Sequence, residues 1–250
     1  MRRLLQPLNR RKDGPALVAV DFRGARPGAD IRGLADTAER PVWEFTAARW
    51  AGVKVDPDAR AYAAAYADAL AESPCEDVRL LGFCAGSMLA LELARELRAR
   101  GRAVALTLID PLPIGVEFLA VVHAQITRAP SAEVRAGLGR LAGDGPATFA
   151  YLAGLAQEHH ERQCASLGIP ADDEIALDLI DRYLSWIEFA VAASTARRTP
   201  YPGPAAVLLS ADYGDRAAVE DHWEVDRFAA DQADMLRDPA VLEAILRRVS

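Results

Sequence analysis

A single cysteine stands in the segment LLGFCAGSM (residues 80–88), flanked by Gly82 and Gly86. The residues before it follow a strand pattern, and leucines at four-residue spacing after it indicate a helix. A sharp strand-to-helix turn strains the backbone of its central residue and leaves no room for side chains at the two flanking positions. We therefore expect Cys84 to lie at the apex of a nucleophile elbow.

The chemistry expected of Cys84 is that of an activated thiol. The central residue of such a turn lies at the N-terminus of the following helix, where backbone amides and the helix dipole favour an anion. A thiol is partly thiolate at neutral pH, whereas a serine hydroxyl needs a general base to act as a nucleophile. The pattern predicts a nucleophile that forms a covalent intermediate. The competing interpretation is that Cys84 is a small residue buried in the core with no chemical role.

Strand and helix patterns alternate along most of the chain, which is typical of βαβ units and a mainly parallel sheet. The predicted strands are residues 16–22, 41–45, 77–83, 103–109, 205–210 and 223–228. The predicted helices in this part are residues 57–71, 84–100 and 239–248. Residues 116–195 have an almost entirely helical pattern, which predicts a lid inserted into a single domain of residues 1–250.

Composition excludes several classes of protein. The chain has 250 residues, of which 51% are hydrophobic and 26% charged, as expected for one globular domain with a sizeable core rather than a disordered chain. A net charge of −7 gives no reason to expect nucleic acid or an anionic membrane surface as a partner.

Targeting and metal-binding patterns are also absent from the sequence. No apolar run reaches the roughly 18 to 20 residues that a transmembrane helix needs, and no apolar signal core follows the basic N-terminus. The expected location is therefore the cytoplasm. Cys75, Cys84 and Cys164 have no spacing typical of a zinc site or a disulfide framework, so we expect no metal.

The order and spacing of these motifs resemble the α/β-hydrolase thioesterases of polyketide and nonribosomal peptide assembly lines. Gly82-Phe83-Cys84-Ala85-Gly86 stands where that family has Gly-x-Ser-x-Gly, and residues 107–110 (TLID) resemble its strand ending in Leu-Leu-Asp. Residues 230–236 (ADQADML) resemble its Gly-Asp-His-x-x-Met-Leu. The resemblance covers nearly the whole chain and implies an α/β-hydrolase fold: a mainly parallel central sheet with flanking helices and a helical lid.

The resemblance implies a catalytic set with two departures from the family. Cys84 replaces the serine nucleophile, and Gln232 occupies the position of the catalytic histidine, where it would orient the site by hydrogen bonding. Asp110 would be the acid of the triad, although an aspartate there can also serve only the Asp-Pro turn. In another branch of the family the acid follows the penultimate strand, which gives Asp212 or Asp215 as the alternative.

The same resemblance places an oxyanion hole and an acyl channel. The backbone amides of Ala85 and of the loop near Arg23 would hold the oxyanion. Apolar lid residues would line the channel or simply pack the lid on the sheet; these are Phe118, Phe149, Tyr151, Tyr183, Trp186 and Phe189.

The four histidines offer few substitutes for the missing base. His222 precedes the last predicted strand, so it should lie at the opposite end of the sheet from the Gln232 loop. His123, His159 and His160 fall in the lid, where one of them could reach over the elbow or where all could be ordinary polar positions.

Three functions remain open, two of them enzymatic and one a binding role. The first is a thioesterase-like acyl- or aminoacyltransferase that takes a group from an acyl or peptidyl carrier protein onto Cys84 and passes it to a second thiol. The second is a cysteine thioesterase or cyclase that releases its product by hydrolysis or internal attack. The third is a catalytically inactive binding partner. No cofactor is expected beyond the phosphopantetheine arm of the substrate.

Overall fold

The computed structural model describes residues 3–22, 31–75, 77–141, 143–170, 172–197, 199–214 and 219–249. Within these residues seven strands form one sheet in the order β1-β3-β2-β4-β5-β6-β7. The strands are β1 (Leu5–Pro7), β2 (Ala16–Val20), β3 (Val42–Phe45), β4 (Val78–Phe83), β5 (Val104–Ile109), β6 (Ala205–Leu209) and β7 (Glu224–Arg227).

The predicted mainly parallel sheet is confirmed. Strands β3, β2, β4, β5, β6 and β7 pair in parallel with their neighbours, and only the edge strand β1 pairs antiparallel, with β3. The sequence did not predict β1, which is three residues long and ends in a proline. Parallel strands bring their C-terminal ends to one edge of the sheet, where the residues following β2, β4, β5 and β6 meet.

Helices lie on both sides of this sheet. They are α1 (Arg32–Thr37), the 3-10 helix η1 (Arg49–Ala51), α2 (Ala59–Ala71), α3 (Gly86–Ala99), α4 (Val116–Thr127), α5 (Ser131–Arg140), α6 (Gly145–Leu167), α7 (Glu174–Ser194) and α8 (Pro239–Val249). Several begin at a capping aspartate: Asp58, for example, accepts hydrogen bonds from the backbone amides of Arg60 and Ala61 at the start of α2.

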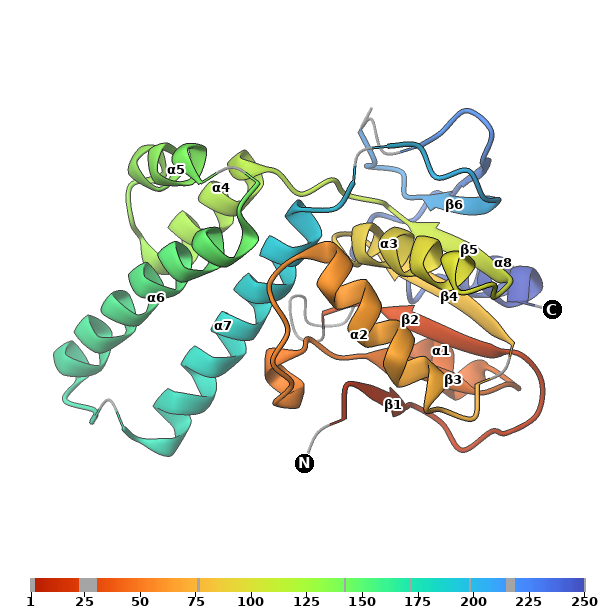
Figure 1. The fold of residues 1–250 in the computed structure, drawn as a ribbon, viewed down its shortest axis with the longest axis horizontal. Coiled ribbons are helices and arrows are strands. Elements are labelled where there is room, and N and C mark those ends of the chain that lie inside the picture. The colour runs from red at the N-terminus through yellow and green to blue at the C-terminus, as the bar shows by residue number, and fades with distance from the viewer. Residues whose placement is uncertain are drawn as a thin grey trace.

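Alternate residues of the strands supply two apolar cores. Val18, Leu80 and Leu108 face α2, α3 and α7, whereas Leu17 and Leu81 face α1 and α8 on the other side. In Figure 1, α2 and α3 lie in front of the sheet and α1 and α8 lie behind it. Both faces of the strands are therefore buried, which explains why their sequences are continuous apolar runs instead of alternating ones.

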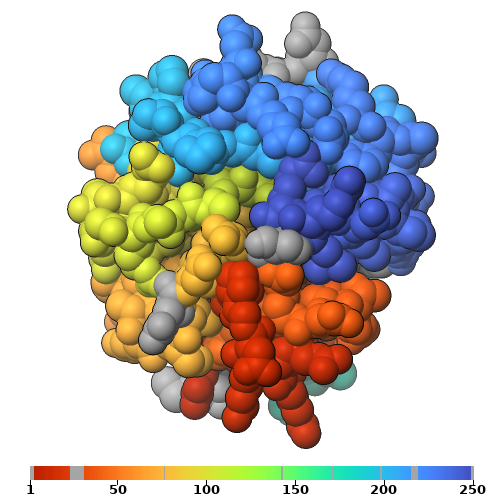
Figure 2. Space-filling view, turned by 90° about the vertical axis from the view of Figure 1, so that its right-hand side faces the viewer, coloured from red at the N-terminus to blue at the C-terminus, as the bar shows by residue number. Residues whose placement is uncertain are grey.

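Helices α4 to α7, residues 116–194, follow β5 and precede β6, and we call them the lid. The lid occupies the left of Figure 1, and α7 is the lid helix that runs back to pack on α2 and α3. Figure 2 shows the end of the molecule away from the lid, where the N-terminal segment (red) and α8 (dark blue) reach the surface. No helix in the described residues is long and apolar enough to cross a membrane.

Candidate active site

Cys84 lies at the turn between β4 and α3, as the motif predicts. Its φ angle of 51° is in the left-handed region, which is strained for a residue with a Cβ. The turn is fixed by backbone hydrogen bonds: Cys84 N donates to the Ile109 oxygen at 2.9 Å, and Leu112 N donates to the Cys84 oxygen at 3.2 Å. The thiol residue is thus held in the geometry of a nucleophile elbow.

The two glycines of the motif are required by close packing. A Cβ on Gly82 would lie 2.6 Å from the Cα of Ser87, and a Cβ on Gly86 would overlap the carbonyl oxygen of Val20. Gly86 therefore lets the start of α3 touch the end of β2. This contact brings the residues that follow β2 next to the elbow.

Asp110 follows the neighbouring strand β5 at the same edge of the sheet. Phe83 and Ile109 are paired in register, so the next residues along the two strands, Cys84 and Asp110, lie side by side. Asp110 is fully buried, and its φ of 43° is also left-handed. Its Oδ1 accepts a hydrogen bond from Ser210 N at 2.8 Å and its Oδ2 accepts one from Ser210 Oγ at 2.6 Å. The carboxylate is thereby fixed in place from the adjacent strand β6.

The Gln232 loop lies beside the loop that follows β6. Asp212 is exposed, and its Oδ1 accepts a hydrogen bond from the backbone amide of Gln232 at 2.9 Å. Met235 and Leu236 are buried and anchor the loop in the core under α1 and α8. The geometry gives Asp212 a role in shaping the Gln232 loop, whereas Asp110 is the aspartate beside the elbow. Asp215 lies outside the described residues.

The two amides expected to form the oxyanion hole are only partly described. Ala85 lines the same cavity as Cys84, and so do Asp21 and Phe22, the first residues after β2. Arg23, the other residue expected to contribute an amide, lies outside the described residues. The described part of this loop, Asp21 and Phe22, does lie at the elbow.

A cavity of about 420 Å³ opens onto Cys84 and runs under the lid. Its walls come from the loop after β2, from the elbow, and from one face each of α4 and α7. The aromatic residues that line it are Phe22, Phe83, Phe118, Tyr183, Trp186 and Phe189. Along α7 the lining extends from Leu179 to Ala190, which corresponds to roughly 16 Å of helix at 1.5 Å per residue.

Four of the six apolar lid residues singled out from the sequence line this cavity. Phe118, Tyr183, Trp186 and Phe189 line the cavity, and Phe189 packs against Phe22 with ring centroids 5.8 Å apart. The other two do not line it. Tyr151 packs against Gly137 of α5, and Phe149 is partly buried against the main core.

None of the four histidines is among the residues described as lining this cavity. Nε2 of His222 donates a hydrogen bond to the Tyr201 carbonyl oxygen at 3.2 Å, near the start of β6 and away from the elbow, as predicted. His160 lies 3.6 Å from the sulfur of Cys164 on α6. His123 is buried behind the cavity wall, with Nδ1 2.9 Å from the hydroxyl of Tyr183.

The buried position of His123 affects its protonation. Burial, with a smaller contribution from nearby His159, lowers the pKa of His123 to about 4. The ring is therefore neutral at pH 7. Its contact with the cavity passes through Tyr183, so it does not reach Cys84 directly.

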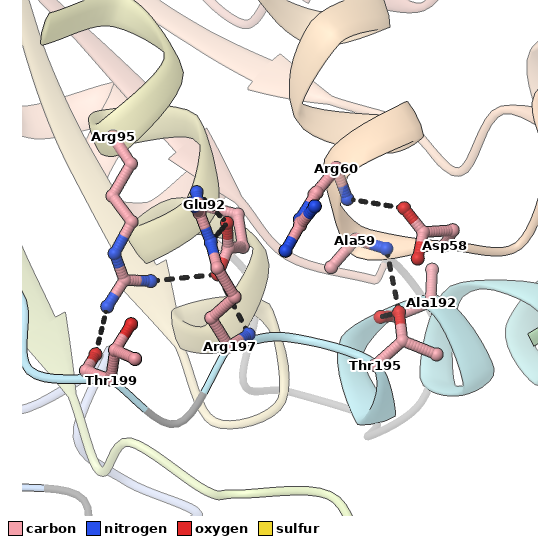
Figure 3. A network of polar contacts seen from close by, with 9 residues as sticks. All are labelled: Asp58, Ala59, Arg60, Glu92, Arg95, Ala192, Thr195, Arg197 and Thr199. Carbon is pink, nitrogen blue, oxygen red and sulfur yellow. Dashed lines mark hydrogen bonds and ion pairs between the residues drawn. The ribbon is translucent and has the colours of Figure 1, made fainter. Parts of the chain in front are cut away.

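A buried carboxylate joins the end of α7 to the elbow helix α3. Glu92 on α3 is 1% exposed. Its Oε2 accepts hydrogen bonds from Nη2 and Nε of Arg197 at 2.6 Å and 2.9 Å, and its Oε1 accepts from the same Nε at 3.2 Å. Arg95 donates to the same carboxylate at 2.8 Å. Figure 3 shows this network, in which Thr195 also accepts a bond from the Ala59 amide at 2.8 Å. These contacts fix the position of α7 relative to Cys84.

Comparison with known proteins supports this interpretation of the fold. A family model, the thioesterase domain, matches residues 31–143, a range that contains Cys84 and Asp110. The structure is similar to the NocB thioesterase domain in covalent complex with a fluorophosphonate nocardicin G analogue, with a TM-score of 0.60, 19% identity, and coverage of 99% of this chain and 100% of that chain. The fold is the α/β-hydrolase fold.

Two further solved structures, both of thioesterases, share this α/β-hydrolase fold. BorB, a type II thioesterase from the borrelidin biosynthetic cluster, gives a TM-score of 0.61 at 17% identity, covering 99% of this chain and 98% of that chain. The surfactin thioesterase domain SrfTE gives a TM-score of 0.56 at 14% identity, covering 97% and 94%. A search of curated protein sequences finds no match.

Two residues of the site were not singled out from the sequence. Ser210 ends a predicted strand, and Asp21 lies at the end of the run ALVAVDF. Ser210 and Asp21 could have been identified as polar residues at the end of an apolar strand, because the C-terminal ends of parallel strands lie around the site. Applying that signal requires the strand order, which the sequence does not reveal.

Proposed function

We propose that this protein is a thioesterase-type enzyme of natural-product biosynthesis that transfers an acyl or aminoacyl group between thiols through a Cys84 acyl-enzyme. The donor would be a thioester on the phosphopantetheine arm of an acyl or peptidyl carrier protein. The observation that carries the proposal is a thiol in a complete nucleophile elbow whose cavity contains no histidine among its described lining residues.

The transfer consists of two thiol–thioester exchanges. The Cys84 thiolate attacks the thioester carbonyl, the carbon–sulfur bond to pantetheine breaks, and the pantetheine thiolate leaves with the electron pair and later takes up a proton. A second thiolate then attacks the Cys84 thioester, and Cys84 leaves in the same way. The oxyanion formed in each step would be held by backbone amides at the elbow, including that of Ala85.

The missing histidine affects the two acceptors differently. A thiol is partly ionised at neutral pH and needs little help to attack. Water, with a pKa of about 15.7, needs a general base, and loss of that base typically costs about 10² to 10⁴ in rate. We therefore infer that Gln232 suppresses hydrolysis more than thiol transfer. Gln232 would orient the site by hydrogen bonding, since an amide does not exchange protons as a base.

The proposal draws support from the comparisons and from the fold. The similar structures are thioesterase domains and a type II thioesterase of biosynthetic clusters, and the strained elbow is a feature that an inactive scaffold has no need to keep. Because those proteins are thioesterases, release by hydrolysis is the alternative that an experiment must separate from transfer.

Intact-protein mass spectrometry after mixing with acyl and aminoacyl pantetheine thioesters tests the covalent step. The wild type should gain the mass of one acyl group, and Cys84→Ala should gain none. Cys164→Ala provides the matched control, because Cys164 is a buried free cysteine of α6 outside the cavity, and this variant should load like the wild type. Absence of an adduct with every donor would favour a binding protein, and an adduct on Cys84→Ala would refute the assignment.

A further inference from the structure

The lid contains a buried histidine that the proposed reaction does not use. His123 on α4 is 1% exposed, and its neighbour Val122 lines the cavity. Nδ1 of His123 bonds the hydroxyl of Tyr183 on α7 at 2.9 Å, whereas its Nε2 is buried without a hydrogen-bond partner among the described residues. A half-satisfied polar group is costly to bury, and an apolar residue would fill this space without that cost. What His123 adds at this position is the bond to Tyr183.

Tyr183 is a half-buried part of the cavity wall. Its ring stacks on that of Trp186, which also lines the cavity, with centroids 6.0 Å apart and planes 8° apart. The imidazole of His123 lies nearly parallel to the Tyr183 ring, with centroids 6.1 Å apart. Burial raises the pKa of Tyr183 above its ordinary value, so its hydroxyl stays protonated at neutral pH. His123 therefore fixes one end of a stacked aromatic pair through a bond between neutral groups.

Tyr183 lies away from the reacting end of the cavity. The lining residues of α7 are three or four positions apart and so share one face of the helix. Phe189 packs on Phe22 next to the elbow and marks the inner end, whereas Leu179 is 60% exposed and marks the outer end. Tyr183 precedes Phe189 by six residues, which corresponds to roughly 9 Å of helix. Tyr183 is therefore placed beside the distal part of a bound group and not beside the reacting carbonyl.

The wall between these two positions is apolar. Its residues come from α4 and α7 and are Phe118, Val122, Trp186 and Phe189. The charged side chains among the described lining residues are Asp21, at the start of the loop after β2, and Arg182, which is exposed. Covering apolar surface stabilises a bound group in proportion to the area removed from water. A short acyl group would leave most of this wall uncovered, so the wall favours a long apolar one.

We propose that the transferred group is a long apolar acyl chain that extends from Cys84 to Tyr183, and that His123 is a positioning residue that holds Tyr183 against this chain. This inference rests on the proposed function and narrows its substrate class. Tyr183 contacts the chain and determines specificity, and His123 acts through Tyr183. Without the bond to His123 the Tyr183 side chain is less ordered, and the bound chain must restrict it at a cost in entropy. That cost reduces binding and leaves the chemical step unchanged.

The experiment compares the loading of Cys84 by acetyl- and octanoyl-pantetheine. Intact-protein mass spectrometry gives the maximal loading rate and the donor concentration at which half of that rate is reached. The acetyl group ends beside Cys84, whereas an extended octanoyl chain continues along the wall toward Tyr183. In the wild type we expect the octanoyl donor to reach half of its maximal rate at the lower concentration.

Two variants break the bond from opposite sides. Tyr183→Phe keeps the ring and removes the hydroxyl, and His123→Leu removes the nitrogen that bonds it. Each should raise the half-saturating concentration of the octanoyl donor about 2- to 10-fold, the range expected for one hydrogen bond between neutral groups. The maximal rate with octanoyl and both values with acetyl should stay as in the wild type.

Three further variants separate positioning from a general effect on the fold. Because both substitutions break the same bond, the double variant should bind the octanoyl donor no more weakly than either single variant. His123→Gln offers Tyr183 an amide oxygen and should restore most of the wild-type value. Tyr151→Phe is the matched control and should load like the wild type, because Tyr151 is a lid tyrosine that packs on Gly137 and is not among the cavity residues.

A readout without chemistry distinguishes this inference from the proposed function. Calorimetry should show octanoyl-pantetheine binding to Cys84→Ala, and adding Tyr183→Phe should weaken that binding about 2- to 10-fold. If no donor loads the wild type but this binding pattern holds, transfer is refuted while the roles of Tyr183 and His123 in chain binding stand. If neither loading nor binding is seen, both proposals fail.

Other outcomes would overturn this inference and leave the Cys84 acyl-enzyme intact. One is a wild type that loads from the octanoyl donor but reaches half of its maximal rate at no lower concentration than with acetyl. Equal changes for acetyl and octanoyl in Tyr183→Phe and His123→Leu would show a structural role only. Additive effects in the double variant would show that the two residues act separately.

Discussion

Ser210 donates two hydrogen bonds to Asp110, one from its backbone amide to Oδ1 and one from its hydroxyl to Oδ2. Both residues are buried, and they come from the ends of neighbouring parallel strands. The aspartate beside Cys84 is thus fixed by a residue on the adjacent strand. Ser210 is a positioning residue for Asp110, and the pair links the elbow to the loop that carries Asp212 and contacts Gln232.

Replacing Ser210 by alanine should therefore destabilise the protein. The variant keeps the amide bond to Oδ1 but leaves Oδ2 of a buried carboxylate without this donor, which costs about 1–3 kcal/mol of unfolding free energy. Urea denaturation measures the loss. Ser194→Ala is the control, because that hydroxyl only donates to the Val191 oxygen within α7. A loss no greater than that of Ser194→Ala would show that the hydroxyl does not support Asp110.

Gly86→Ala should abolish loading of Cys84, because the added Cβ would overlap the carbonyl oxygen of Val20 and move the elbow away from the loop after β2. We expect a loss of about 1–3 kcal/mol in stability from overpacking and at least a 100-fold slower adduct formation. Gly154→Ala on α6 adds the same methyl group where nothing lies within 4 Å, and alanine is favoured over glycine in helices by about 1 kcal/mol. Normal loading by Gly86→Ala would contradict the packing argument.

Arg197→Ala tests how firmly α7 is held. The variant leaves the buried Glu92 carboxylate with the Arg197 backbone amide and Arg95 as its donors, so we expect a loss of about 1–3 kcal/mol in urea denaturation. The comparison is Arg247→Ala on α8, whose ion pair with Glu243 is exposed and whose loss should change stability by no more than about 0.5 kcal/mol. Similar small effects for both variants would mean that the Glu92 network contributes little.

His123 should make the stability of the protein depend on pH. Because burial lowers its pKa from 6.5 to about 4, the unfolded chain binds a proton between these values that the folded chain does not. Above pH 6.5 the ring is neutral in both states, so His123 does not change the free energy of unfolding with pH. As the pH drops from 6.5 toward 4, the free energy of unfolding falls by up to about 3 kcal/mol. His123→Gln, which can still accept a bond from Tyr183, should lose less stability than the wild type between pH 7 and pH 4.5. Parallel curves for the two proteins would show that His123 protonates freely in the fold.

The sequence predicted the strands of the site well because they are continuous apolar runs bounded by turn signals. Residues 78–83 and 104–109 form strands within one residue of the predicted 77–83 and 103–109. The edge strand β1 has three residues and α1 has six. These elements are too short for the strand or helix period of hydrophobic residues to show in the sequence. The predicted strands end where Cys84 and Asp110 lie, so the motif located the strand-to-helix turn at Cys84.

Other parts of the site depend on contacts between distant segments. Ser210 contacts Asp110 only because β6 is the neighbour of β5, and Asp21 lines the cavity only because Gly86 touches the end of β2. Phe118 and Phe149 are both apolar lid residues, and only the packing of the lid helices decides that the first faces the cavity. Which residues face the site follows from tertiary packing, and the periodicity of the sequence does not predict it.

The most direct test of thiol transfer is the fate of the Cys84 acyl-enzyme once it is formed. The isolated adduct is divided between buffer alone and buffer with added pantetheine, and its decay is followed by mass spectrometry for the wild type and for Gln232→His. We expect the wild-type adduct to persist in water but to be discharged rapidly by the thiol, and we expect faster hydrolysis in Gln232→His. Rapid hydrolysis of the wild-type adduct, or no change in hydrolysis in Gln232→His, would contradict the proposed thiol transfer.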